Sequence, residues 1–410
     1  MSHPDLPAPF GAAWAARPQA EYAQLLESGG ITRLTIRPGL EPWLVTRYDL
    51  VRAVLGDSRM SIDPANTTQE VRQAIAAGRP EERVAMLGRH LLSVDPPDHT
   101  RMRRLISRAL SPQQMAAMEE PIAEVAERLL DQLAPRDEID LLADYTVPLA
   151  VEVVCRLLGL PEQEFPRFCA WGRAMVRAEL QDAEQFDAAS GDIGKDFAGL
   201  ILTRRRHPGD DLVSVLADAR NEDRLDDHEL LSLVYQLFFA GHESSAHFMA
   251  NAALALIEDP TTRAAVVDDP ARLTEALEEL LRLEGSVKVP TWRFATERVT
   301  VGDVTILPGE PVLALLAAAG RDPAVNPEPD EFRLDRPDRN HLAFGFGIHH
   351  CIGAPLGRVE SRIGIHALFC RFPDITLARP VDHLQWRVNL MMRGPCELPV
   401  RLRREAPVSL

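Results

Sequence analysis

Apolar residues recur at helical spacing over most of the chain, and two stretches are long enough to predict individual helices. Residues 227–258 are apolar on nearly every side, follow a capping-box pair formed by Asp226 and Glu229, and end at Asp259-Pro260. Such a helix has little polar surface for water, so we expect it to cross the middle of a large core. Ser111-Pro112 predicts the start of a second helix over residues 113–133.

Signals for β-strands are few and short. Residues 34–36 and 43–46 predict one hairpin, and residues 299–301 and 304–307 predict another around Gly302-Asp303. Residues 398–402 predict an edge strand. The fold class that follows is mainly α, with small antiparallel β-sheets.

The composition narrows the class of protein. The 410 residues include 45 Lys and Arg against 61 Asp and Glu, a formal net charge of −16, and 46% of them are hydrophobic. This balance excludes wholesale disorder, and the net acidity argues against nucleic acid as a main partner. No apolar stretch reaches about 18 residues, so we expect no membrane span, and we expect no signal peptide. The five cysteines are scattered and form no CxxC, which favours a reducing cytoplasm.

The densest chemical motif is His-Leu-Ala-Phe-Gly-Phe-Gly-Ile-His-His-Cys-Ile-Gly at residues 341–353. Gly345 and Gly347 allow a tight turn, and Cys351 stands just before a helix-like segment that begins at Ala354. Backbone N–H groups and the helix dipole stabilise a thiolate in such a place. A zinc site made of this cysteine and the motif's histidines lacks the paired spacing of structural zinc ligands. A buried structural cysteine is the other interpretation.

A polar spot, Ala240-Gly-His-Glu-Ser-Ser245, interrupts the long apolar helix. A glycine in mid-helix costs roughly 1 kcal/mol relative to alanine. Serine hydroxyls compete for helix carbonyls, and a buried carboxylate at Glu243 needs a partner. The spot therefore predicts either a groove with a function or a close helix–helix contact through Gly241.

Taken together, these motifs resemble those of the cytochrome P450 superfamily. Phe344-Gly-x-Gly-x-His349-x-Cys351-x-Gly353 is similar to its haem-binding loop, and Ala240-Gly241-x-Glu243-Ser244 to the oxygen-binding groove of its distal helix. Glu279-Leu-Leu-Arg282 is similar to the ExxR motif, which alone is a weak signal. The resemblance implies a single P450 domain over residues 1–410. Its β-rich region would span about 30–60 and 286–320, and its helical haem-binding body about 90–285 and 340–375.

The resemblance also implies roles for individual residues. Cys351 would be the axial ligand of the haem iron, and Glu243 and Ser244 would be the acid–alcohol pair that delivers protons. Serine stands where the family usually has threonine, which keeps the hydroxyl but loses the methyl that fixes its rotamer. Glu279 and Arg282 would support the haem loop through the meander at residues 332–336. The other cofactor-binding residues would be His99, Arg103, Ala240, Gly241, Arg293, Phe344, His349 and Gly353.

The expected substrate pocket is apolar. Its candidate lining comprises Phe239, Val287, Val289, Pro290, Met391 and Met392, with the segments 61–92 and 175–186. Ordinary core packing is the alternative for each of these residues. A basic run (Arg101, Arg103, Arg104 and Arg108), with Arg358 and Arg362, would face an acidic electron donor or be a solvated helix face.

The reaction implied by the resemblance is insertion of one oxygen atom from O2 into a lipophilic small molecule, by C–H hydroxylation or epoxidation. The run from Arg282 to Arg293 and the cysteine loop resemble actinobacterial members that tailor macrolides and other secondary metabolites. The implied cofactor is haem b, the electron donors are ferredoxin and ferredoxin reductase, and the protein would be a cytoplasmic monomer. Oxidative coupling or ring formation, a peroxide-driven reaction and a non-catalytic haem protein are the alternatives.

Overall fold

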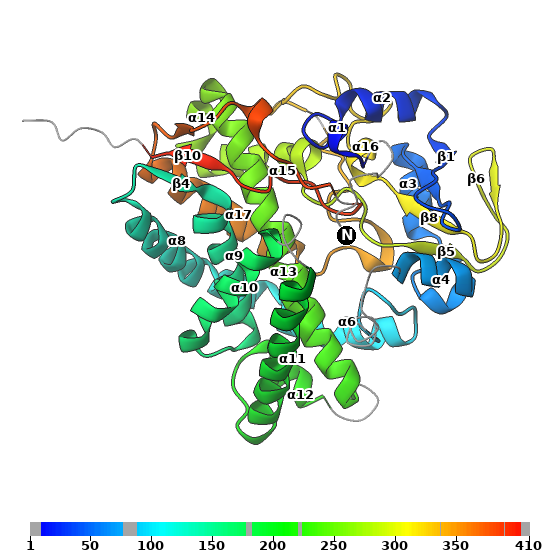
Figure 1. The fold of residues 1–410 in the computed structure, drawn as a ribbon, viewed down its shortest axis with the longest axis horizontal. Helices are drawn as coiled ribbons and strands as arrows, with labels where there is room; N and C mark the ends of the chain where they lie inside the picture. Colours follow the sequence, from blue (N-terminus) through cyan, green and yellow to red (C-terminus); the bar gives the residue numbers. More distant parts are fainter. Residues whose placement is uncertain are drawn as a thin grey trace, which may run out of the picture.

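The computed structural model describes residues 10–76, 88–177, 183–219, 224–336, 338–388 and 390–402 (Figure 1). Its helices are α1 (Ala12–Ala15), α2 (Gln19–Glu27), α3 (Tyr48–Gly56), α4 (Gln69–Ala76), α6 (Asp98–Ala109), α7 (Pro112–Ala117), α8 (Glu119–Leu133), α9 (Val147–Leu158), α10 (Phe165–Arg177), α11 (Ala183–Arg206), α12 (Leu212–Ala217), α13 (Asp227–Glu258), α14 (Pro260–Val267), α15 (Pro270–Glu284), α16 (Leu316–Ala319) and α17 (Ala354–Arg371). A π-helical turn spans Leu142–Thr146, and 3₁₀ turns span Pro64–Asn66, Glu162–Glu164, Gly347–His349 and Val381–His383.

The strands are short. They are β1 (Ile31–Arg33), β2 (Trp43–Val45), β3 (Met60–Ser61), β4 (Glu138–Asp140), β5 (Arg293–Ala295), β6 (Val299–Val301), β7 (Val304–Ile306), β8 (Pro311–Ala314), β9 (Thr376–Leu377) and β10 (Pro399–Arg401). The fold is therefore mainly α, as the sequence predicts.

Helix α13 has the predicted bounds and position. The Asp226 carboxylate accepts from the Glu229 amide, and the Glu229 side chain accepts from the Asp226 amide, so the predicted capping box is confirmed. Leu233, Val234 and Phe238 are fully buried. In Figure 1 the helix crosses the middle of the molecule, with α9 to α12 on one side and strands β5 and β8 on the other.

The helix predicted over residues 113–133 is divided in two. Ser111 caps the start of α7, as predicted, and also forms a capping box with Gln114, but a turn at Met118 separates α7 from α8. Pro121 explains the break, because proline has no N–H to donate to the Ala117 carbonyl and its ring crowds that carbonyl.

The first predicted hairpin forms with its first strand displaced. Strand β1 lies at residues 31–33 and pairs antiparallel with β2. Residues 34–36 continue toward the turn, where the Leu34 amide donates to the Pro42 carbonyl over 3.0 Å. The sheet has the order β1-β2-β8-β5-β3, and β2 and β8 run parallel. The predicted small antiparallel sheets are confirmed, and β2 with β8 is the one parallel pair among the described strands, joined by a long and mostly helical connection.

Two further strand predictions have different outcomes. The hairpin of β6 and β7 is confirmed, with its second strand ending at Ile306. The prediction that residues 398–402 form an edge strand is wrong, because β10 lies between β4 and β9. Val400 is fully buried, which fits the central position.

A C-terminal hairpin, defined here by its described residues 385–388 and 390–396, reaches back toward the start of β5. The Arg387 amide donates to the Gly394 carbonyl over 3.0 Å and closes the hairpin. Its tip pairs with residues 286–289, through a Val287–Met392 bridge and a bond from the Lys288 amide to the Met391 carbonyl. Among the described residues, no helix combines the length and apolarity needed to cross a bilayer.

Candidate active site

The loop before α17 holds Cys351 in a tight turn. The Cys351 amide donates to the Phe344 carbonyl over 2.8 Å. Gly345 and Gly347 have φ angles of 72° and 75°, in the left-handed region that favours glycine. A Cβ on Gly347 would lie 2.6 Å from the Leu55 carbonyl oxygen, so the loop also presses on the end of α3. The predicted glycine-dependent turn is confirmed.

Opposing effects act on the pKa of the Cys351 thiol. Desolvation by the surrounding protein raises the pKa of the thiol, although the residue as a whole is exposed, and the backbone N–H groups of Gly353 and Ala354 and the positive charge of Arg103 lower it only in part. These amides belong to the N-terminus of α17, where the helix dipole favours a negative sulfur. Within the described part of the chain, no cluster of three or more His, Cys, Asp and Glu side chains could hold a metal ion.

His99, Arg103, Arg293 and His349, which are far apart in sequence, converge beside this loop. The imidazole centroids of His99 and His349 lie 4.2 Å apart. Burial is the main reason that the pKa of His99 falls to about 4 and that of His349 to about 3, and neighbouring arginines lower both further. His99 Nε2 and His349 Nδ1 are buried and have no partner among the described residues.

Arg293 adds a buried positive charge to the same place. Its side chain is 2% exposed, and burial lowers its pKa to about 10. The nearby acid, Asp95, is already bonded to the Ser61 hydroxyl and the Ile62 amide. Two arginines and two unpartnered imidazole nitrogens therefore fit a dianionic group such as the propionate pair of a haem.

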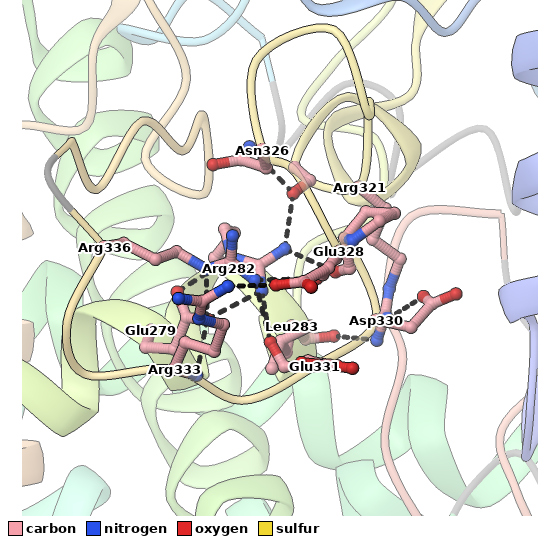
Figure 2. Close-up of polar contacts among 12 residues, drawn as sticks. Glu279, Arg282, Leu283, Arg321, Asn326, Glu328, Asp330, Glu331, Arg333 and Arg336 are labelled. Atoms are coloured by element: carbon pink, nitrogen blue, oxygen red, sulfur yellow. Dashed lines mark hydrogen bonds and ion pairs between the residues drawn. The ribbon is translucent and has the colours of Figure 1, made fainter.

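Glu279 and Arg282 lie on one face of α15 and anchor the meander at residues 327–336 (Figure 2). Arg282 Nε and Nη2 donate to the Glu279 carboxylate over 2.8 and 2.7 Å. Arg336 Nε donates to Glu279 Oε1 over 2.7 Å, and the Arg333 amide donates to the same oxygen. Burial raises the pKa of Glu279, but the hydrogen bonds from Arg282 and Arg336 outweigh it and lower the pKa. The predicted contact with the meander is confirmed.

A second ionic cluster, which sequence reasoning missed, lies one residue earlier in α15. Glu278 accepts from Arg358 Nε over 2.6 Å and bonds to His341 Nε2 over 3.0 Å. Arg358 in turn lies over the Phe344 ring. The cluster ties both ends of the cysteine loop to α15. No local sequence signal indicates it, since Glu278 and Arg358 are 80 residues apart.

The polar spot of α13 contains the predicted close helix–helix contact, and the functional groove stays a prediction. A Cβ on Gly241 would lie 2.9 Å from Val154 Cγ2, so Gly241 allows the close contact with α9. Ala240 is exposed and Ser244 is half-buried one turn later, on the same face. The Ser244 hydroxyl donates to the Ala240 carbonyl over 2.9 Å.

Glu243 is bonded to the C-terminal hairpin. Arg387 Nη1 donates to Glu243 Oε1 over 2.6 Å and to His247 Nε2 over 2.7 Å. All three side chains are nearly or fully buried. The sequence predicts that Glu243 needs a partner, but it does not identify Arg387, which is 144 residues away.

A further buried acid, Glu360, lies in α17 beside the polar spot. Burial raises the pKa of Glu360 to about 8, and a hydrogen bond with Ser245 lowers it only in part. A Cβ on Gly357 would lie 3.9 Å from both Ser245 Oγ and Phe344 Cε1, so this part of α13 is close to the cysteine loop. The protonated carboxyl of Glu360 can donate as well as accept a hydrogen bond.

The predicted pocket residues are only partly brought together. Val287, Met391 and Met392 meet at the hairpin tip and are half-buried, and Pro290 is half-buried nearby in sequence. Phe239 is half-buried in α13. Val289 packs in a core cluster with Phe10, Tyr22 and Leu44 and is 1% exposed, which favours the alternative of core packing for this residue. Residues 77–87 and 178–182 of the two predicted segments lie outside the described residues.

Four of the arginines named with the basic run are bonded to acids or to the backbone. Arg101 pairs with Glu229, Arg358 with Glu278, and Arg362 with Glu119. Arg103 donates to the His350 carbonyl over 2.7 Å. The sequence run contains no acids, but acids from other elements reach Arg101, Arg358 and Arg362 in space. That this face receives an acidic electron donor stays a prediction.

Comparison with known proteins agrees with this geometry. The family model for cytochrome P450 matches residues 195–385. Mycinamicin IV hydroxylase/epoxidase from Micromonospora griseorubida is 40% identical over 92% of this chain and 94% of its own. Cytochrome P450 monooxygenase PikC from Streptomyces venezuelae is 38% identical over 96% of this chain and 93% of its own.

The solved structures agree at the level of the fold. The crystal structure of a myxobacterial cytochrome P450, CYP267B1, in complex with myristic acid superposes with a TM-score of 0.88 and 34% identity. It covers 97% of this chain and 99% of the other. The family implies a haem-thiolate cofactor, and the residues around Cys351 and Arg293 fit one. The chain belongs to the cytochrome P450 family and is a monooxygenase of that family.

Proposed function

We propose that this enzyme uses haem b to hydroxylate or epoxidise a lipophilic small molecule of secondary metabolism. The observation that carries the proposal is one arrangement: the Cys351 thiol at the N-terminus of α17, beside two arginines and two unpartnered imidazole nitrogens. This arrangement has a position for a thiolate ligand and positions for two carboxylates. A haem would fit both, because it carries two propionates and its iron accepts a sulfur ligand.

Named residues have separate roles in the proposal. Cys351 ligates the iron, His99, Arg103, Arg293 and His349 bind the propionates, and Phe344 and Gly353 shape the loop around the sulfur. When bound, the haem supplies the oxidation chemistry, in which one atom of O2 enters the substrate and the other is reduced to water. Glu243 and Ser244 hold and pass the protons that this reduction consumes. Ala240 leaves space beside them because its side chain is small, whereas Gly241 lets α13 approach α9 closely.

The substrate class is proposed from the hairpin tip and the relatives. Val287, Met391 and Met392 form an apolar wall, and methionine adapts to irregular ligands. A mycinamicin hydroxylase/epoxidase among the relatives supports a macrolide-like substrate. Electrons would come from ferredoxin and ferredoxin reductase, as in the bacterial three-component members that the sequence resembles. The enzyme would act as a cytoplasmic monomer, and the five cysteines, which form no disulfide within the described residues, suit a reducing compartment.

The test is turnover with the purified protein, ferredoxin, ferredoxin reductase and NADPH, using macrolides chosen by their shift of the haem spin state. Under ¹⁸O2 we expect one labelled oxygen atom in the product, and none in a Cys351→Ala control. Product that requires both redox proteins supports the proposal. Product formed as fast from hydrogen peroxide alone would identify a peroxygenase, and a coupled product without new oxygen would identify oxidative coupling.

A further inference from the structure

One face of α13 is joined to the C-terminal hairpin by a row of polar contacts. Glu243, His247 and Asn251 are spaced four residues apart, so they lie above one another on the helix. The first two bond to Arg387, and Asn251 Nδ2 donates to the Arg393 carbonyl over 3.2 Å. We call this row the hairpin seam.

The chemistry of arginine fixes the donor and the acceptor in the Arg387–His247 contact. Arginine only donates hydrogen bonds, so His247 Nε2 must accept from Arg387. The His247 ring is therefore neutral, with its proton on Nδ1. Burial and the charge of Arg387 support this, because both hold the pKa of His247 well below its usual value.

The fit at the seam is close. A Cβ on Gly394 would lie 2.3 Å from His247 Nδ1, so any larger residue in the hairpin would displace the imidazole. The Glu243 and Arg387 side chains are 9% and 4% exposed. A buried ion pair of this kind is costly to break by removing one partner, because the other is left as an uncompensated charge.

The acid and the alcohol of α13 have separate hydrogen-bond partners. Its Oε1 atom accepts from Arg387, on the hairpin side of α13, while the Ser244 hydroxyl donates to the Ala240 carbonyl. The acid and the alcohol are thus each bonded to a different group. The guanidinium occupies Oε1, so the position of the whole carboxylate relative to Ser244 depends on Arg387.

We propose that Arg387 is the positioning residue for Glu243, and that proton transfer through Glu243 depends on the place at which this ion pair holds the carboxylate. The inference rests on the proposed function and deepens it. Arg387 shares the C-terminal hairpin with Met391 and Met392, which we place in the substrate wall. A substrate that moves the hairpin tip would therefore also move Arg387, which links substrate occupancy to proton delivery.

The test compares Arg387→Met and Arg387→Lys with Glu243→Gln and with the double variant Glu243→Gln/Arg387→Met. Arg393→Met is the matched control, because Arg393 lies in the same hairpin and pairs with Glu284 of α15 instead of Glu243. Each holoenzyme is first checked for an intact thiolate–haem spectrum. Substrate affinity, product rate, the fraction of NADPH recovered in product and the kinetic solvent isotope effect are then measured.

General acid–base catalysis contributes 10²–10⁴-fold, so we expect a misplaced Glu243 to slow product formation by about tenfold or more in Arg387→Met. The solvent isotope effect should increase and substrate affinity should stay within about twofold. Arg387→Lys should recover much of the rate, and Arg393→Met should leave the isotope effect unchanged. In the Glu243→Gln background, Arg387→Met should have no further effect on the isotope effect.

Equal isotope effects in Arg387→Met and Arg393→Met, or additive effects of Arg387→Met and Glu243→Gln, would overturn the inference. The unfolding midpoint gives a readout independent of turnover. The double variant should unfold at a higher temperature than Arg387→Met alone, since it contains no unpaired buried carboxylate. Loss of the thiolate–haem spectrum in the wild-type protein would instead contradict the proposed function itself.

Discussion

The guanidinium of Arg358 lies over the ring of Phe344, with Cζ 4.4 Å from the ring centroid, beside the loop that carries Cys351. Glu278 fixes this guanidinium through two bonds of 2.6 and 2.9 Å. The same carboxylate bonds to His341 at the start of the loop. One acid of α15 thus positions two residues of the cysteine loop and the first turns of α17.

Replacing Glu278 by Gln should weaken this arrangement in a pH-dependent way. Burial raises the pKa of Glu278, but bonds from His341 and Arg358 outweigh it and lower the pKa from 4.5 to about 2. A lowered pKa contributes stability that is fully present above pH 4.5 and is lost as the pH falls toward 2. Allowing for solvent screening, we expect Glu278→Gln to lower the free energy of unfolding by about 1–2 kcal/mol at neutral pH.

Urea unfolding at several pH values measures this effect. The Glu278→Gln variant should lose less stability than the wild type between pH 4.5 and the acid limit, because it has no carboxylate to protonate there. Glu275→Gln is the control, since Glu275 lies in the same helix and makes an exposed pair with Arg339. An acid dependence identical in all three proteins would rule out this role for Glu278.

Replacing Gly347 by Ala should disrupt the cysteine loop. The substitution forces alanine to a φ of 75° and brings a methyl group 2.6 Å from the Leu55 carbonyl oxygen. Gly345→Ala is the matched control, because its φ is 72° but its nearest contact is 3.9 Å. We expect a loss of about 1–2 kcal/mol in the control and at least about twice that in Gly347→Ala, measured by urea unfolding. Equal losses would show that the contact with Leu55 is unimportant.

Replacing Arg282 by Lys should destabilise the whole haem-loop support. Arg282 satisfies the Glu279 carboxylate and three carbonyls, those of Gly320, Pro329 and Glu331, and lysine cannot reproduce that planar set of bonds. We expect Arg282→Lys to lower the free energy of unfolding by about 3–5 kcal/mol and to reduce haem retention. Arg272→Lys, at an exposed pair in the same helix, should cost less than about 0.5 kcal/mol. An unfolding curve for Arg282→Lys that matches the control would contradict the structural role.

Replacing Ser244 by Ala should lower the fraction of NADPH recovered in product, because it removes the hydroxyl that we propose passes protons. We expect product formation to fall by about tenfold or more, with substrate affinity unchanged. Ser244→Thr keeps the hydroxyl and restricts its rotamer, so its recovery should equal or exceed that of the wild type. A Ser244→Ala enzyme with unchanged recovery would remove Ser244 from the proton path.

Sequence reasoning succeeded where the signal is local. The long helix, its capping box, the glycine turn before Cys351 and the bond between Glu279 and the meander all follow from spacing or from a family motif. The family resemblance implied that His99 and Arg293 are among the cofactor-binding residues. That they meet beside the cysteine loop depends on tertiary packing, which the structure supplies.

The features that were missed depend on partners far apart in the chain. Arg387 and Glu278 have ordinary surroundings in the sequence, and only the fold brings them to Glu243 and Arg358. β10 is a central strand because β4 and β9 pair with its two sides, and its own sequence does not show these partners. The break at Met118 is different, because Pro121 was visible in the sequence and its missing N–H accounts for it.

The central claim is that Cys351 ligates a haem iron as a thiolate. The most direct measurement is the difference spectrum of the dithionite-reduced protein after addition of carbon monoxide. We predict a Soret band at about 450 nm for the wild type and its loss in Cys351→Ala. A protein that binds no haem, or a Cys351→Ala variant that keeps the band, would contradict the account.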